Sequence, residues 1–209
     1  MLLSLVDLFD VAVAATDGEI GKVCNFLFDD LSWTIRYVVV DVRSWLTRHD
    51  VVLSVEAMDQ LDWTKKTLRV NLSKDQVRHS PDVDSRKPVS RQQELAMRQY
   101  FGLAADRARN INAEFPSISL PAGREFPVDP AEDPHLRSTE NLTGYEVWAT
   151  DGEIGHLENF IVDEGSWHIG YLDVKTGHWL HSRSILIPTR WVKSVSWAHH
   201  RVKLDHTRF

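Results

Sequence analysis

Two pairs of acidic residues are the first candidates for catalytic or metal-binding chemistry in this chain. They lie in the heptapeptide Ala-Thr-Asp-Gly-Glu-Ile-Gly, which occurs at residues 15–21 and again at 149–155. The carboxylates concerned are Asp17 and Glu19, and Asp151 and Glu153. Such groups could bind a hard cation or act as a general acid/base pair. An Asp-Gly pair between apolar runs is also a strong signal for a type I′ β-hairpin. We therefore interpret the heptapeptide as a hairpin turn and predict no metal site there.

Imidazole side chains gather near the C-terminus, where seven of the ten histidines lie at or after His156. Candidate metal ligands of this kind are His178, His181, His199 and His200. The residues 134 positions earlier are Ser44, Thr47, Lys65 and Lys66, so the fold does not require imidazole at these places. We predict solvated loop histidines, with a metal- or small-ligand-binding protein as an alternative.

Nucleophilic chemistry has little support in the sequence. Cys24 is the single cysteine, which excludes an internal disulfide and a Cys-rich zinc site. It aligns with Glu158 and has no histidine near it in sequence to activate it. No nucleophile elbow or phosphate-binding glycine loop is present. The sequence therefore predicts a non-enzymatic protein with no catalytic, cofactor-binding or metal-binding residues.

The repeated heptapeptide belongs to a longer internal duplication. Residues 15–73 and 149–207 align at a constant offset of 134 without a gap, and 18 of the 59 aligned positions are identical. Three tryptophan pairs are retained: Trp33 and Trp167, Trp45 and Trp179, and Trp63 and Trp197. Trp148 and Trp191 occur in the second copy alone, which predicts packing at an interface or contact with a partner.

Short apolar strands at close spacing fill both copies and predict an antiparallel sandwich or barrel. We expect a mainly β protein of two small barrels, packed as an internal pseudo-dimer. The first repeat is placed at 1–78, a connector at 79–138 and the second repeat at 139–209. Seven of the eight prolines fall in the connector, where a capping box before an apolar stripe predicts one helix at about 91–101.

The charge distribution argues against nucleic acid as a partner. The net charge is -6, and the three segments carry -3, -1 and -2, so no basic segment hides within the average. Nucleic-acid binders usually show a basic domain or stripe. No apolar run approaches the roughly 20 residues needed to cross a bilayer. We expect a cytoplasmic protein without direct membrane insertion.

The run Thr-Asp-Gly-Glu-Ile-Gly, followed by a strand, an acidic turn and the segment Ile35 to Asp41, resembles the PRC-barrel domain. That family is named after the cytoplasmic domain of the photosynthetic reaction centre H subunit. It also includes the C-terminal domain of the ribosome maturation factor that assists small-subunit assembly. Connector segments such as 80–84, 87–92 and 133–139 resemble those of bacterial tandem PRC-barrel proteins. The resemblance implies small β-barrels used as adaptors, with no catalytic residues to transfer.

The function expected from these features is a non-catalytic adaptor that binds another protein. A membrane-associated or photosynthetic-type complex is the setting that the resemblance suggests. The alternative is an accessory factor in ribosome assembly or RNA processing, which would need basic patches that the average conceals. The identity of the protein partner is open at this point, as is formation of a homo-oligomer.

Overall fold

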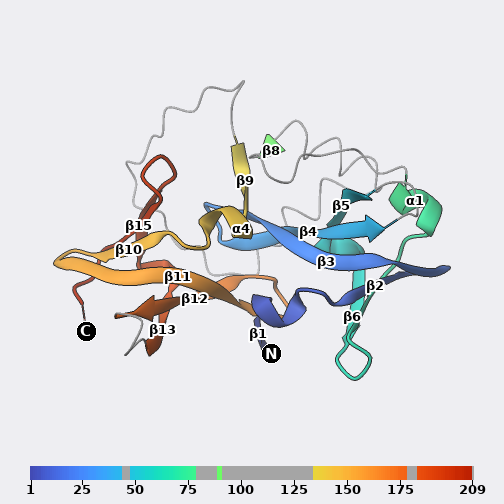
Figure 1. Cartoon of the computed structure of the whole chain (residues 1–209), viewed down its shortest axis with the longest axis horizontal. Helices are drawn as coiled ribbons and strands as arrows, with labels where there is room; N and C mark the ends of the chain where they lie inside the picture. The colour runs from blue at the N-terminus through green and yellow to red at the C-terminus, as the bar shows by residue number, and fades with distance from the viewer. Residues whose placement is uncertain (44–47, 79–88, 91–133, 178–182, 209) are drawn as a thin grey trace.

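The structure, a computed structural model, describes residues 1–43, 48–78, 89–90, 134–177 and 183–208 (Figure 1). It is mainly β, with two sheets and a few short helices. The first sheet contains β2 (Ala12–Ala15), β3 (Gly18–Asp29), β4 (Thr34–Arg43), β5 (Arg48–Ser54), β6 (Met58–Asp62), β7 (Thr67–Val70), β8 (Val89–Ser90) and β9 (Pro134–Ser138). The second contains β1 (Leu2–Ser4), β10 (Glu146–Ala149), β11 (Gly152–Asp163), β12 (Ile169–Thr176), β13 (Arg183–Pro188), β14 (Val192–Ser196) and β15 (Arg201–Leu204).

In the part of the chain that the structure describes, the helical segments are short and lie between the strands. They are η1 (Leu5–Leu8), η2 (Val55–Ala57), α1 (Lys74–Arg78), α4 (Thr139–Leu142) and η3 (Thr189–Trp191). The helix expected at about 91–101 lies outside the described residues. Below, residues 1–78 are called the first half and residues 139–208 the second half.

The two sheets have the same strand order. It runs β5-β4-β3-β2-β7-β6 in the first sheet and β13-β12-β11-β10-β15-β14 in the second. The longest strands, β3 and β11, begin and end 134 residues apart. We use "counterpart" below for residues separated by this offset.

Closed barrels were expected, and this expectation is wrong for both sheets. Each strand path is open, with β5 and β6 at the two ends of the first and β13 and β14 at the ends of the second. The reason is local: η2 and η3 redirect the chain after β5 and β13. The next strand, β6 or β14, therefore pairs with β7 or β15 at the other end of the sheet, and forms the edge there.

The repeated heptapeptide does form the first hairpin of each half, between β2 and β3 and between β10 and β11. The type I′ turn centred on Asp-Gly is wrong. Ala15 pairs with Gly18, so Thr16 and Asp17 make the turn, and neither has a positive φ. The glycine after them takes the positive φ, 131° at Gly18. The strained conformation thus falls on the residue without a Cβ.

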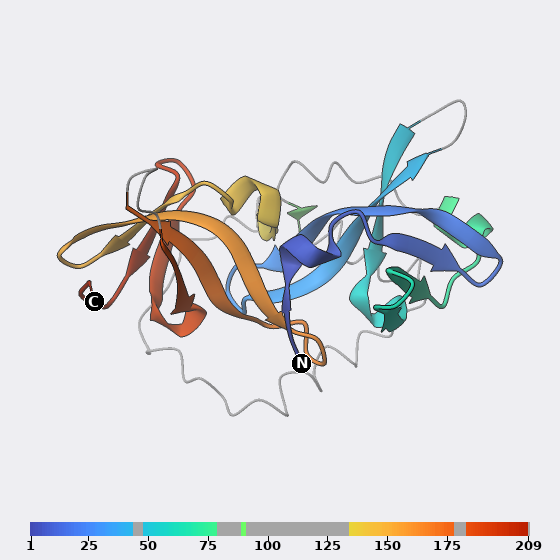
Figure 2. The same cartoon turned by 60° about the horizontal axis from the view of Figure 1, so that its bottom comes forward.

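The two halves exchange strands. β1 of the first half pairs antiparallel with β11 of the second sheet, and β9, which precedes the second half, pairs antiparallel with β3 of the first sheet. The registers correspond: Leu2 lies opposite Asp163, and its counterpart Leu136 lies opposite Asp29. Figure 2 shows β1 and the N-terminus at the middle of the molecule, between the two sheets.

A tryptophan from each half closes the junction. Trp33 and Trp167 have φ values of 53° and 56°, which is costly for a bulky residue. In return, the Trp167 carbonyl accepts a hydrogen bond from the Ile35 N–H (2.9 Å) and the Trp33 carbonyl accepts one from the Ile169 N–H (2.7 Å). The hydrogen bonds at the junction are therefore reciprocal.

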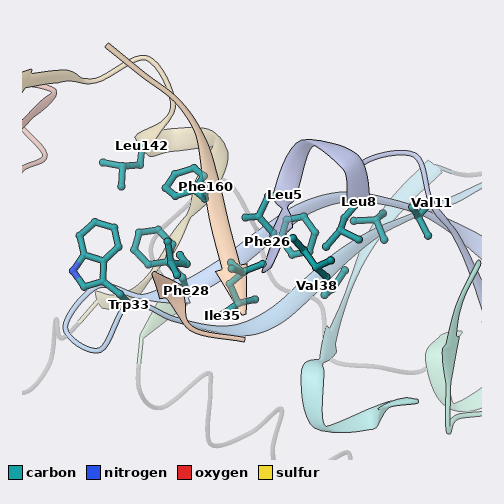
Figure 3. Close-up of a cluster of buried hydrophobic side chains, with 14 of the residues drawn as sticks. Leu5, Leu8, Val11, Phe26, Phe28, Trp33, Ile35, Val38, Leu142 and Phe160 are labelled. Carbon is teal, nitrogen blue, oxygen red and sulfur yellow. The ribbon is translucent and has the colours of Figure 1, made fainter. Parts of the chain in front are cut away.

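One apolar core runs through both halves. Phe28 stacks on Trp33 with ring centroids 5.4 Å apart, and it meets Phe160 of the second half at 6.2 Å. Figure 3 shows this contact, with Leu142 beside it and Leu5 further along the same cluster. A unit of roughly 70 residues buries too little surface to be robust alone, so a shared core stabilises both halves.

Candidate functional site

The acidic residues of the heptapeptide are used within the fold. The Asp17 carboxylate accepts a hydrogen bond from the Lys74 backbone N–H at 2.8 Å. Its counterpart Asp151 accepts one from the Arg208 N–H at 2.8 Å, and this bond is the main cause that lowers the Asp151 pKa. Both aspartates thus fasten the segment that follows the last strand of their half.

The last glycine of the heptapeptide is needed for a close approach between strands. A Cβ on Gly21 would lie 2.1 Å from the Asp41 carbonyl oxygen, and one on Gly155 would lie 2.0 Å from that of Lys175. No side chain fits at these separations. The heptapeptide is therefore explained by backbone geometry and hydrogen bonding.

The acidic turns at the ends of β3 and β11 are also local structures. The Asp29 carboxylate accepts hydrogen bonds from the N–H groups of Leu31 (3.0 Å) and Ser32 (2.9 Å). Asp163 accepts the corresponding bonds, and the Ser166 hydroxyl adds a third at 2.9 Å. The hydroxyl is the largest cause that lowers the Asp163 pKa. Both carboxylates therefore stabilise the turns that follow β3 and β11.

The histidines that suggested a metal are used in different ways. His199 Nδ1 lies 2.9 Å from the Ser196 hydroxyl within the exposed β14–β15 turn, whereas the His200 ring lies 4.9 Å from the Tyr145 ring. His178 and His181 lie outside the described residues. In the part of the chain that the structure describes, no three His, Cys, Asp or Glu side chains come together as metal ligands would.

Cys24 is half-buried on β3, and its thiol donates a hydrogen bond to the Val39 carbonyl at 3.4 Å. It packs beside an apolar cluster on the outer face of the first sheet. Its surroundings are those of a small apolar residue.

A cavity of about 520 Å³ lies where β9 meets the second half. Its walls come from β9, from the end of α4 with the loop that follows, and from the β14–β15 turn. The lining residues are Arg137, Asn141, Thr143, Gly144, Tyr145, Trp197 and His200. We call this cavity the Arg137 pocket.

Arg137 and two aromatic rings form the rigid part of the pocket. The guanidinium carbon lies 4.4 Å from the centre of the Trp197 ring, a cation–π contact. Arg137 Nε also donates to an Asp30 carboxylate oxygen at 3.1 Å. Tyr145 meets Trp197 edge to face at 5.8 Å, and its hydroxyl donates to the Trp197 carbonyl at 3.4 Å. The side chains are thus fixed before any ligand arrives.

The titratable and hydroxyl side chains of the pocket lining are Arg137, Thr143, Tyr145 and His200. Burial raises the pKa of Tyr145, and the nearby positive charge of Arg137 opposes this in part. The phenol therefore stays neutral at neutral pH. The Thr143 hydroxyl donates to the Thr139 carbonyl at 2.9 Å, and the lining includes no carboxylate or thiol. The lining offers aromatic faces and hydrogen-bond donors.

Apolar side chains stand at three of the corresponding positions of the first half. Arg137 has Leu3 as its counterpart, Thr143 has Phe9 and Tyr145 has Val11. Leu3 and Val11 are buried, and the Phe9 ring packs on Phe26 at 5.7 Å. The two halves thus share a strand order, but the positions that line the pocket carry different residue types in each half.

A second arginine–tryptophan stack lies on the outer side of β10 and β15. The Arg201 guanidinium lies 4.4 Å from the Trp148 ring, and both side chains donate to Glu146 at 2.7–3.1 Å. Trp191 stacks on His206 at 4.3 Å. Both tryptophans that are specific to the second copy thus have partners within their own half.

The sequence comparison between copies missed the pocket because Arg137 and Tyr145 precede the aligned segment 149–207. Extending the same offset to residue 136 would have shown Leu3 replaced by arginine and Val11 by tyrosine. That change from apolar to polar types is the signal that could have identified the site.

The fold and the site together define a mainly β protein of two like sheets, with a preformed aromatic and arginine-lined binding pocket. Residues 135–207 match the PRC-barrel domain family, so the second half contains a PRC-barrel domain. A search of curated proteins found none that matches the chain. Among the described residues, the structure has no helix with the length and apolarity required to cross a membrane.

Proposed function

We propose that this protein is a non-catalytic adaptor of two PRC-type units that binds another protein through the Arg137 pocket. The proposal rests on one observation: the side chains that line the pocket are of the types that dominate interfaces, and they hold one another in place. Arginine, tryptophan and tyrosine dominate the binding energy of protein interfaces, particularly when they sit in pre-formed pockets. Here all three lie in one cavity and hold one another in place.

The assignment of the first half as a second PRC-type unit is part of this proposal. It is supported by the shared strand order and by the constant offset of 134 residues between the elements. In this interpretation the first half, which has Leu3 and Phe9 at the positions of Arg137 and Thr143, acts as the scaffold. The second half, which matches the family, supplies recognition. A membrane-associated complex is the setting we propose for the partner, from the family resemblance.

Affinity capture from native lysate at low salt tests the proposal, with three forms of the full chain as bait. Wild type should retain a protein partner, and Trp197→Ala should lose it because the pocket loses its aromatic wall. The matched control is Trp63→Ala, which changes the counterpart residue in the first half, exposed at 39%. It should retain the partner.

Three results would contradict the proposal. The first is equal recovery of the same proteins by all three baits. The second is turnover of a substrate by the purified chain that a single side-chain change abolishes. The third is recovery of ribosomal proteins or RNA that fades steeply with salt, which would favour the alternative role in ribosome assembly.

A further inference from the structure

The outer face of the first sheet carries an apolar cluster that is fully covered. Its members are Leu27, Tyr37, Val39, Val52 and Leu136, all at 2% exposure or less. Leu27 lies between Phe26 and Phe28 of the shared core, so alternation along β3 places it on the opposite face. β9 contributes Leu136, and β8 extends the sheet beyond β9 with Val89 opposite Leu136.

The counterpart face of the second sheet is partly open, with Leu2 and Leu186 exposed and Ile161 and Tyr171 half-buried. Its residues are Leu2, Ile161, Tyr171 and Leu186, which we call the β1 face. Leu2 and Leu186 are exposed at 58% and 52%, where their counterparts Leu136 and Val52 are buried. β1 pairs with β11, and within the described ranges no strand adds to it in the way that β8 adds to β9. An unpaired edge beside exposed apolar side chains is a template for strand addition.

Acidic groups border the β1 face. Asp163 lies opposite Leu2 in the ladder, and Asp173 lies opposite Leu186, where the first sheet has Val39. The strand that occupies the equivalent edge of the first sheet, Val89–Ser90, is flanked in sequence by Lys87 and Arg91. A basic, apolar-centred segment therefore matches the template on β9 and the two carboxylates beside β1, of which Asp163 also lies 3.8 Å from the Met1 ammonium.

We propose that the β1 face receives an extended segment of the partner protein, which adds antiparallel to β1. The segment has an apolar residue opposite Leu2 and basic residues on either side. This inference rests on the proposed adaptor role, and it uses a surface that shares no residue with the Arg137 pocket. The partner would thus be held by main-chain hydrogen bonds at β1 and by apolar contact with Leu2 and Leu186.

The test uses the isotope-labelled full chain and a synthetic peptide that copies residues 85–93, whose centre is the β8 segment. Titration followed by backbone amide NMR should shift the signals of Leu3, Ser4 and Leu186. Leu2→Asp and Leu186→Asp should each raise the peptide Kd by about tenfold or more, because each loses apolar contact and adds negative charge. Both side chains are exposed, so the amide spectra of the variants should show an intact fold.

Matched controls separate this proposal from the pocket. Leu31→Asp changes a leucine exposed at 69% in the β3–β4 turn and should alter the peptide Kd by less than about twofold. Trp197→Ala should leave peptide binding unchanged even if it abolishes partner capture. The inference is wrong if the shifts concentrate on residues 134–138 of β9, if the Leu31 variant weakens binding equally, or if β1 shows no shift at several millimolar peptide.

Discussion

Asn25 should be the most costly polar side chain to remove at the exchanged strands. It lies on β3 at 4% exposure, and its Nδ2 donates to the Ser138 hydroxyl at 2.8 Å. Its Oδ1 accepts from the Thr139 hydroxyl at 3.1 Å. Asn25→Ala therefore removes the side-chain hydrogen bonds that β3 makes to Ser138 and Thr139 at the start of the second half.

The magnitude follows from the burial of the groups left behind. Ser138 and Thr139 are 2% and 1% exposed, so water cannot replace the lost amide. An unsatisfied buried polar group costs about 1–3 kcal/mol, so two affected hydroxyls give an expected loss of about 2–6 kcal/mol. The counterpart Asn159 is half-buried and bonds the Ser4 hydroxyl and the Val6 N–H, near solvent. Asn159→Ala should cost about 0.5–1.5 kcal/mol.

Urea denaturation of both variants at pH 7 measures this difference. The m-values must be equal for the free energies to be compared. A loss for Asn159→Ala as large as that for Asn25→Ala would refute the reasoning, because the two sites differ mainly in burial. So would a loss below about 1 kcal/mol for Asn25→Ala.

Two further substitutions test the backbone and the junction. Gly155→Ala places a Cβ 2.0 Å from the Lys175 carbonyl oxygen, so urea denaturation should show a loss of about 2–4 kcal/mol in the free energy of unfolding. In Gly165→Ala the nearest contact of the new Cβ is 3.4 Å, and the loss should be under about 1 kcal/mol. Equal losses would contradict the explanation that Gly155 is needed for the close approach of the two strands. Burial holds the pKa of His168 below its ordinary value of 6.5, so the unfolded chain takes up a proton first as the pH falls. The free energy of unfolding is therefore highest above about pH 6.5 and decreases as the pH falls from there toward the folded-state pKa of His168. His168→Thr should make this decrease with pH smaller. A slope unchanged in the variant would show that another group titrates.

Local features of the fold could be predicted from the sequence because short-range geometry determines them. The first hairpin of each half follows from apolar runs that flank Asp17-Gly18, and the strand order recurs wherever the offset of 134 holds. The prediction placed Gly18 at the centre of the turn, whereas Gly18 is the first residue of β3 and has a φ of 131° there.

Long-range pairing could not be predicted in the same way. The alternation of apolar residues in β1 fits either sheet, and no local signal assigns Leu2–Ser4 to the sheet of the other half. The expected barrels stay open for a similar reason, since closure depends on where β6 and β14 pair after a single turn of helix. The pocket forms where β9 meets the β14–β15 turn, and these segments are some 60 residues apart in sequence. Patterns of apolar residues predict local structure and do not show which distant segments meet.

The most direct test of the central claim is to fill the Arg137 pocket with the residue that the first half has there. Thr143→Phe installs the counterpart of Phe9 at an exposed position, so the melting temperature should change little. Titration of the captured partner against this variant should show an affinity at least about tenfold weaker than that of wild type. An unchanged affinity, with the fold intact, would show that recognition does not use the pocket.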